Sequence, residues 1–368
     1  MTALMPSTAT TGPQPPLAWA RLKDMPGCSG DLQDGTPHPE LQLQLGFELR
    51  WDDDTGAFDG VWLSPFAANA SATMPCSKAV RSSLDRSEKL RDVIIGSGAR
   101  PSIARRVRYF PSDAALMHLY GCTPSNDGYD CDDARAFSDG PACVDAHGFS
   151  SPLLVHSAFL ATAGNSMRCV HLIPNMYELV AWETGSDRSA SGVVAQRAYE
   201  AAGAVPLSRR EPTMAYLGRS DTPAMQQRRY LRSRGWAGAD DDASETWLQM
   251  PDYMPMEEAA ARFAYQLDVG GSSGTTWDAL QWKLASGALV FKAKNAEGAA
   301  DLWHTQLRDS EHLLEVASDF SDLRARYEWA RNHTAEAAQI AAAGQRVALA
   351  NMPRSVHVEA LKAVLQTL

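Results

Sequence analysis

One segment of this 368-residue sequence constrains the fold more than any other, because it has the pattern strand, glycine-rich loop, helix and strand. Residues 265–269 predict a buried strand, and the loop 270–276 follows it directly. Apolar residues at helical spacing predict a helix over 277–285, which should end at Gly287 before a second strand at 288–291. Strands joined in this way lie parallel with a right-handed crossover. The segment therefore predicts an α/β protein.

The glycine-rich loop 270–276 is the best candidate for a ligand site. Glycines let the backbone approach a ligand closely, and a helix N-terminus offers unpaired N–H groups. Ser272, Ser273, Thr275 and Thr276 add hydroxyl groups, and either threonine is a credible N-cap. This composition suits the diphosphate of a nucleotide. The loop matches neither a P-loop nor G-x-G-x-x-G, so an ordinary tight turn is the alternative interpretation.

Five arginines follow a short strand that is predicted over 213–217 and ends at Gly218. A guanidinium group matches phosphate oxygens two at a time, so one or two of these arginines are candidates for a phosphate clamp. The alternative is a solvated helix face, which is the usual fate of a charge run. The five residues are Arg219, Arg228, Arg229, Arg232 and Arg234.

Two further groups of acidic residues are candidates for chemistry. Glu183 and Asp187 follow a strand predicted over 177–182, where carboxylates often face a ligand cleft, so either one is a candidate general base or a surface carboxylate. Asp-Asp-Asp occurs at 52–54 and again at 240–242. Each triplet resembles the Asp-x-Asp metal site of some glycosyltransferases, but turns explain both better, and 52–54 falls between hairpin strands predicted at 45–51 and 58–63.

The remaining organisation is simpler. Residues 1–40 are predicted to be a disordered or loosely attached lead, and 118–150 a polar insert within the N-terminal half. Cys122, Cys131 and Cys143 lie in that insert and could form a local disulfide loop in an oxidising compartment. The sequence contains no C-x-x-C pair, so its cysteine spacing does not predict a zinc site. The other predicted elements are a strand at 168–173 and helices at 257–263, 321–329, 334–344 and 356–365.

Charge and hydropathy exclude some classes of protein. With 34 basic and 44 acidic residues the net charge is −10, which argues against a dedicated nucleic-acid-binding protein. No run of 18 apolar residues predicts a membrane span, and the first 20 residues lack the apolar centre of a secretory signal. His304 and His312 belong to no recognisable triad or metal-binding spacing, and are read as ordinary polar or packing residues.

The second half resembles the Rumi-like protein O-glucosyltransferase family, which includes the fungal capsule-associated xylosyltransferases. The resemblance covers about residues 205–348, and order and spacing agree along it. Little of residues 1–165 matches. The matching stretches include Arg209-Arg-Glu-Pro-Thr-Met-Ala-Tyr-Leu-Gly218, Pro251-Asp-Tyr-Met-Pro, Tyr265-Gln-Leu-Asp-Val-Gly-Gly271, Leu284-Ala-Ser-Gly-Ala-Leu-Val-Phe-Lys292 and Asp319-Phe-Ser-Asp-Leu323.

This resemblance implies a GT-B fold, in which two Rossmann-like domains face each other across a cleft. The N-terminal acceptor-side domain would span 41–204 and the sugar-nucleotide-binding domain 205–352, with a C-terminal helix at 353–368. The implied activity is inverting, metal-independent transfer of glucose or xylose from a UDP-sugar to a hydroxyl of a protein or glycan acceptor, with no other cofactor. The family also suggests the lumen of the secretory pathway, although no signal peptide is visible and the cytosol stays open.

The resemblance also implies a donor site, and the chain departs from the family pattern within it. Ala279 stands where the family has an arginine that neutralises the diphosphate, and the catalytic carboxylate is ambiguous between Glu183 and Asp187. A degenerate, non-catalytic member that binds a glycan or protein partner is therefore the alternative function. The implied donor-site residues are Gly218, Arg219, Ser220, Thr222, Arg228 or Arg229, Gly271, Ser272, Ser273, Gly274, Thr275, Thr276 and Trp277.

Overall fold

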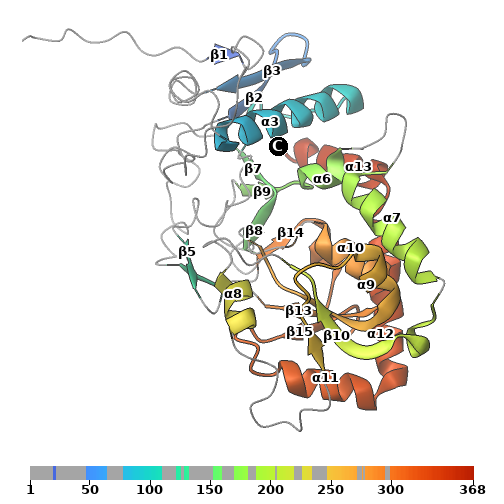
Figure 1. Cartoon of the computed structure of the whole chain (residues 1–368). Coiled ribbons are helices and arrows are strands. Elements are labelled where there is room, and N and C mark those ends of the chain that lie inside the picture. The colour runs from blue at the N-terminus through green and yellow to red at the C-terminus, as the bar shows by residue number, and fades with distance from the viewer. Residues whose placement is uncertain are drawn as a thin grey trace, which may run out of the picture.

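The chain folds around two sheets, one from each half of the sequence (Figure 1). The α/β class and the organisation into two sheet-centred halves are therefore confirmed. The computed structural model describes residues 20–21, 47–63, 78–109, 122–125, 128–131, 152–159, 170–180, 188–203, 205–218, 226–233, 247–271, 276, 278–294 and 299–368.

The N-terminal sheet is mixed, with strand order β1-β3-β2-β4-β7-β9. Pairing is antiparallel from β1 to β4 and parallel among β4, β7 and β9. Helices α3 (Lys78–Ser97) and α13 (Arg354–Gln366) pack on it and share its hydrophobic core. Strand bounds are β1 Ala20–Arg21, β2 Phe47–Trp51, β3 Phe58–Leu63, β4 Arg106–Tyr109, β7 Leu153–Val155 and β9 Val170–Leu172.

Most expectations for the N-terminal half are confirmed where the structure describes it. β2 and β3 form the predicted hairpin, and β9 is the strand predicted at 168–173. β1 pairs with β3, so this part of the predicted lead belongs to the sheet. In the insert, β5 (Cys122–Ser125) pairs with β6 (Gly128–Cys131), and the register sets Cys122 opposite Cys131. The disulfide loop stays a prediction, and Cys143 lies outside the described residues.

The C-terminal sheet is parallel throughout, with strand order β11-β10-β12-β13-β15. The predicted strand–loop–helix–strand unit is β12, α10 (Ala279–Ala285) and β13, and its strands are parallel as expected. Strand bounds are β10 Glu211–Tyr216, β11 Leu248–Gln249, β12 Phe263–Asp268, β13 Leu289–Ala293 and β15 Leu314–Val316.

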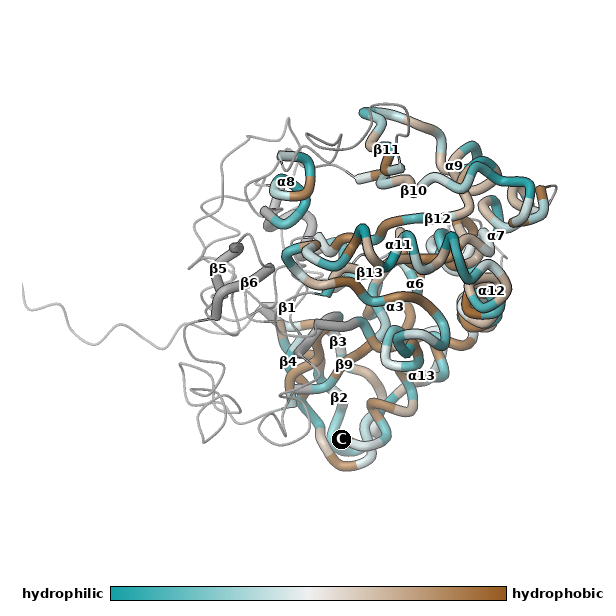
Figure 2. Tube along the Cα trace, turned by 90° about the horizontal axis from the view of Figure 1, so that it is seen from below, coloured by the Kyte–Doolittle hydropathy of each residue, from teal (hydrophilic) through white to brown (hydrophobic). Residues whose placement is uncertain are grey.

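Helices cover both faces of this sheet, because alternate strand residues enter two different cores. Met214 and Tyr216 pack in one cluster with α11 (Leu323–Asn332), whereas Ala215 packs in the other with α7 (Ala190–Gly203), α9 (Met256–Arg262) and α10. In Figure 2 the brown, hydrophobic stretches follow β12 and β13, and teal segments lie on outer helices such as α9. α12 (Thr334–Ala350) contributes to both clusters.

Two helix boundaries differ from the predictions. α10 begins at Ala279 instead of residue 277, and Asp278, not a threonine, is its N-cap residue. α12 continues to Ala350, whereas its sequence pattern predicts a stop at Gly344 or shortly after. Gly344 is needed for packing instead, since a Cβ there would lie 2.1 Å from the carbonyl oxygen of His312. The helices predicted at 257–263, 321–329 and 356–365 are confirmed as α9, α11 and α13.

The two halves are joined by short segments at the centre of the molecule. β8 (Ser157–Phe159) pairs antiparallel with β14 (Ala299–Asp301), and α13 returns from the second half to the core of the first. Figure 1 shows β8 and β14 side by side between the sheets. None of the helices described is long and apolar enough to cross a membrane.

Candidate functional site

The C-terminal sheet has a topological switch point between β10 and β12. Numbered along the chain, its strands lie in the order 2-1-3-4-5. In open sheets of this kind, ligands bind beyond the carboxyl ends of the strands where the order reverses. That place lies between Gly218, which follows β10, and Gly270, which follows β12. The described ends of the two predicted donor-site segments, Gly218 and Gly271, therefore flank the position where this fold class binds ligands.

Helix α8 (Gln226–Ser233) ties the strand ends around this point. Arg232 donates from Nη2 to the carbonyl oxygen of Gly218 at 3.2 Å, beyond β10. Arg228 donates from Nε to the carbonyl oxygens of Val269 at 3.2 Å and Gly270 at 3.0 Å, beyond β12. Four of these five residues, all but Val269, belong to the predicted arginine and glycine pattern, so these described parts of it converge in space.

Gln227 of the same helix reaches two further parallel strands, β13 and β15. Its Nε2 donates to the carbonyl oxygens of Lys294, beyond β13, at 3.0 Å and of Ser318, beyond β15, at 2.8 Å. Carbonyls at the carboxyl ends of strands lack partners in the sheet, and buried carbonyls without partners are costly. α8 therefore acts as a polar clasp across β10, β12, β13 and β15.

A buried ion pair lies at the carboxyl end of β12. Lys283 of α10 donates from Nζ to Asp268 Oδ1 at 2.7 Å and to the carbonyl oxygen of Leu267 at 3.0 Å. Thr276 donates its hydroxyl hydrogen to Asp268 Oδ2 at 2.6 Å. The three side chains that make these contacts, Lys283, Asp268 and Thr276, are all buried. Thr276 therefore does not cap α10, because its side chain is directed to the strand end.

Burial alone would raise the pKa of Asp268, but the Lys283 ammonium and the two hydrogen bonds outweigh it, so the pKa lies below its usual value. Asp268 is therefore a carboxylate at neutral pH. Lys292 of β13 also lowers the pKa of Asp268, and no ion pair to another described residue engages its ammonium. Asp278 adds a second carboxyl group, whose pKa burial raises, and Arg228 adds a further cation. The cations Lys283, Lys292 and Arg228 at this edge of the sheet favour an anionic ligand.

Tyr216 and Gly218 define the β10 side of the switch point. A Cβ at position 218 would lie 2.4 Å from the Tyr216 hydroxyl oxygen, so only glycine lets the chain pass over the ring. Burial raises the pKa of Tyr216 to about 12, and its hydroxyl has no hydrogen-bond partner in the part of the chain described. The Tyr216 side chain at the end of β10 is therefore uncharged, and it lies beside the polar clasp that α8 forms.

Several predicted site residues lie outside the described residues. The structure places Gly218, Arg228, Gly271 and Thr276 around the switch point, and Arg229 is exposed on α8. Their role as ligand contacts stays a prediction. The predicted residues outside the described part are Arg219, Ser220, Thr222, Arg234, Ser272, Ser273, Gly274, Thr275, Trp277, Glu183 and Asp187.

The strand predicted over 177–182 is wrong in its described part. Met176–Leu179 is instead a helical turn, α6. Asn175 accepts a hydrogen bond from the Glu178 backbone, and the Glu178 carboxylate accepts one from the Asn175 backbone at 2.8 Å. This reciprocal capping box outcompetes the apolar, strand-like composition of the segment. The argument that placed Glu183 and Asp187 just beyond a strand at 177–182 therefore loses its support, and their role as general base stays a prediction.

Sequence reasoning missed a buried polar cluster between the halves. Burial and the neighbouring Asp301 raise the pKa of Glu178 well above its usual value, and Asn175 donates to Asp301 at 3.4 Å. His304 is buried with neither ring nitrogen bonded to a described residue, and burial lowers its pKa to about 3. No spacing signal could have revealed this cluster, because its members come from separate elements.

The Asp-Asp-Asp triplet at 52–54 is a turn, as its position predicted. Asp52 Oδ1 accepts hydrogen bonds from the Thr55 backbone at 2.7 Å and the Thr55 hydroxyl at 2.8 Å. The triplet at 240–242 lies outside the described residues. Among those described, no group of three or more histidine, cysteine, aspartate or glutamate side chains is placed to hold a metal ion.

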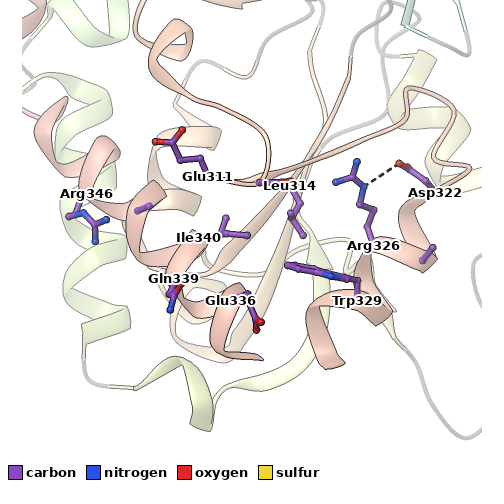
Figure 3. A pocket seen from close by; sticks show the side chains of 12 residues that line it. Glu311, Leu314, Asp322, Arg326, Trp329, Glu336, Gln339, Ile340 and Arg346 are labelled. Atoms are coloured by element: carbon purple, nitrogen blue, oxygen red, sulfur yellow. Dashed lines mark ion pairs between the residues drawn. The ribbon is translucent and has the colours of Figure 1, made fainter. Parts of the chain in front are cut away.

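A cavity of about 890 Å³ lies away from the switch point, between α11, α12 and β15 (Figure 3). Leu314, Trp329 and Ile340 form its apolar centre. On one side Arg326 pairs with Asp322 at 3.5 Å. None of the predicted site residues lines this cavity, so its size alone does not make it the functional site.

Comparisons with known proteins give limited information. No family model matches the chain. The uncharacterized protein 027R of Frog virus 3 (isolate Goorha) is 33% identical over 93 residues, which is 25% of this chain and 10% of that protein. The match therefore spans only about a tenth of that relative, and it shows no shared activity.

Two solved structures of Anabaena Alr3699/HepE are weakly similar to this chain, one in complex with UDP-glucose and one with UDP and glucose. Both have a TM-score of 0.38, with 12% and 11% sequence identity, and the alignment covers 62% of this chain and 66% of HepE, just under two thirds. A TM-score of this size does not establish a common fold. The fold class of this chain rests on its own two sheets.

Proposed function

We propose that the chain is an inverting, metal-independent glycosyltransferase that moves glucose or xylose from a UDP-sugar to a hydroxyl of a protein or glycan. The observation that supports this most is the topological switch point, where Gly218 beyond β10 and Gly270 beyond β12 are both bonded by arginines of α8. The sequence resemblance over 205–348 points independently to the same residues. The proposed donor site comprises Gly218, Arg219, Ser220, Thr222, Arg228, Arg229, Gly271, Ser272, Ser273, Gly274, Thr275, Thr276 and Trp277.

The proposed reaction is a single displacement. Glu183 or Asp187 takes the proton of an acceptor hydroxyl, and the resulting oxygen attacks the anomeric carbon from the face opposite UDP. The bond from that carbon to the diphosphate oxygen breaks, and UDP leaves with both bonding electrons. Backbone N–H groups of the glycine loop and the excess of cations around β12 stabilise the negative charge on the leaving group.

The chemical test is UDP release from a panel of UDP-sugars in the presence of EDTA. We expect release from UDP-glucose or UDP-xylose that survives chelation and is abolished when both Glu183 and Asp187 are changed to the corresponding amides. Strict dependence on a divalent ion would contradict the proposed mechanism and return attention to the acidic triplet at 240–242. The single variants Glu183→Gln and Asp187→Asn identify which carboxylate is the base.

The site assignment has a separate binding test. Gly274→Val should obstruct close approach of a diphosphate and weaken UDP binding at least about 10-fold, or about 1.4 kcal/mol, in calorimetric titration. Gly203→Val is a matched control, because no atom lies within 4 Å of a Cβ at this end of α7. We expect the control to bind UDP normally. If Gly274→Val also binds UDP normally, the nucleotide does not sit on this loop.

A non-catalytic binding protein is the second candidate function. Ala279 opens α10 where the family has an arginine, and the nearest buried cation, Lys283, is already paired with Asp268. Failure of the wild-type protein to bind UDP at millimolar concentration would favour this alternative. Ala279→Arg then becomes informative, since an arginine at the start of α10 should strengthen UDP binding if the loop is a diphosphate site.

A further inference from the structure

The chain of contacts at the carboxyl end of β12 fixes the position of one proton. Asp268 has a lowered pKa and is ionised, so both of its carboxylate oxygens only accept hydrogen bonds. Lys283 Nζ occupies Oδ1 at 2.7 Å, and the Thr276 hydroxyl occupies Oδ2 at 2.6 Å. A hydroxyl has a single hydrogen, and the hydrogen of Thr276 is committed to the carboxylate. Any further partner of the Thr276 oxygen must therefore be a donor.

An ionised phosphate oxygen is only an acceptor, so it cannot bond to Thr276 in this state. Hydroxyl and N–H groups of a ligand can, and a nucleotide sugar carries them on its ribose, its sugar and its base. The diphosphate is left to the other donor groups of the proposed site. The Thr276 oxygen can therefore only accept a hydrogen bond from a ligand. The sequence does not reveal this restriction, because the loop contains four similar hydroxyl residues.

We propose that Asp268 and Lys283 are positioning residues that make Thr276 a hydrogen-bond acceptor, so that this position recognises an O–H or N–H group of the ligand and not a phosphate. The proposal rests on the proposed function, because it assigns a specificity role within that donor site. Lys283 lies one helical turn beyond Ala279, on the same face of α10. Its charge reaches the loop through Asp268 and Thr276.

The first experiment compares UDP with UMP in calorimetric titrations of Thr276→Val and Thr276→Ser. Valine keeps the shape of threonine without its oxygen, and we expect affinity to fall about 10-fold for UDP and UMP alike. Serine keeps the hydroxyl and should bind within about 3-fold of wild type. A loss with Thr276→Val that is much larger for UDP than for UMP would show donation to a phosphate and overturn the proposal. Unchanged binding by Thr276→Val would also overturn it.

The second experiment tests whether Asp268 acts through Thr276. In Asp268→Asn, Lys283 can donate only to the amide oxygen, which directs the amide N–H₂ toward Thr276 and turns the threonine hydrogen outward. We expect Asp268→Asn to lose about as much UDP affinity as Thr276→Val, and the double variant to lose no more than either single one. Fully additive losses would show that Asp268 acts independently of Thr276 and would overturn the proposal.

Two controls keep the outcomes separable. Melting temperatures identify variants that fail to fold, and the Thr276 pair alone decides the polarity if Asp268→Asn does not fold. Binding of neither UDP nor UMP by the wild-type protein at millimolar concentration would contradict the proposed function itself. Normal wild-type binding with an unaffected Thr276→Val variant would contradict only the polarity of position 276.

Discussion

The two sheets differ in what happens at the ends of their strands. In the C-terminal sheet, four parallel strands end at one edge, where α8 bonds their carbonyl groups and a buried ion pair lies at the end of β12. In the N-terminal sheet, the β2–β3 hairpin ends in an exposed turn that residues of the turn itself, mainly Asp52 and Thr55, organise. The carbonyl groups at the carboxyl ends of parallel strands lie at the same edge of the sheet and lack partners there. In a hairpin, residues of the turn itself supply the hydrogen-bond partners. The parallel edge therefore needs polar side chains from distant segments, and the same side chains make it suitable for a ligand.

The strongest test of this difference is Lys283→Met. The substitution leaves the Asp268 carboxylate buried without its ion-pair partner, and the expected loss of unfolding free energy is about 3–5 kcal/mol. Lys292→Met in β13 is the control, because Lys292 is partly exposed and acts on Asp268 only at long range, so its loss should cost less than about 1 kcal/mol. Denaturant unfolding measures both. The double variant Lys283→Met/Asp268→Asn should recover much of the loss, and a silent Lys283→Met would contradict the ion pair.

Two buried histidines, one in each half, should respond in opposite directions to substitution by phenylalanine at pH 7. His156 accepts from the Tyr109 hydroxyl at 2.7 Å and donates to the carbonyl oxygen of Pro174 at 3.0 Å. His156→Phe unpairs both groups, at an expected cost of about 2–4 kcal/mol. His304 has no hydrogen-bond partner among the described residues, so His304→Phe should leave stability unchanged or raise it. Equal destabilisation of the two variants would show that His304 has a partner.

The same pair predicts the response to acid. Burial lowers the pKa of His156 and of His304 from 6.5 to about 3, so the unfolded chain takes up each proton first. Stability should therefore fall as pH drops below about 6.5, by about 1.4 kcal/mol per pH unit for each histidine, until the folded protein is protonated near pH 3. His304→Phe should remove one of these two contributions from unfolding free energies measured between pH 6 and 4. An unchanged slope would mean that His304 is already accessible to protons.

Helix glycines provide a smaller contrast between the halves. Gly344 of α12 packs where a Cβ would lie 2.1 Å from the His312 carbonyl oxygen and 2.8 Å from Leu284 Cδ2. Gly344→Ala should therefore destabilise the protein by about 1–3 kcal/mol, despite the better helix propensity of alanine. Gly96 of α3 faces open space, so Gly96→Ala should gain up to about 1 kcal/mol. Thermal melts of the two variants should shift in opposite directions, and a shared direction would refute the close packing at Gly344.

The smallest effect is expected at the hairpin turn. Asp52→Ala removes the acceptor of the Thr55 backbone and hydroxyl hydrogen bonds on the protein surface. We expect a slight fall in melting temperature and no change in UDP affinity. Asp53→Ala, in the same turn, is the control, since the turn hydrogen bonds use Asp52. A marked loss of UDP binding in Asp52→Ala would revive the metal interpretation of the acidic triplet.

Local patterns in the sequence determined the elements that depend on local interactions. The β12–α10–β13 unit follows from a short apolar run, glycines and helical spacing, which act within about 30 residues. The β2–β3 hairpin follows from two strand-like runs around a turn-forming segment. The segment 177–182 could not be assigned in this way, because a short apolar run is equally compatible with a strand and with a buried helical turn. There the reciprocal bonds of Asn175 and Glu178 selected the turn.

Only the tertiary structure decided which residues share a site. Lys283 looks like a surface residue of a short helix, yet the sheet packs α10 so that its ammonium reaches Asp268, 15 residues earlier. The arginines of α8 look like a solvated face or a clamp, and the fold directs Arg228 and Arg232 to strand-end carbonyls. Gly344 looks like a helix end, and the approach of the His312 backbone makes it a packing position. In each case the deciding neighbour comes from another element, and the sequence pattern carries no information about it because burial and partner are set by how the elements pack.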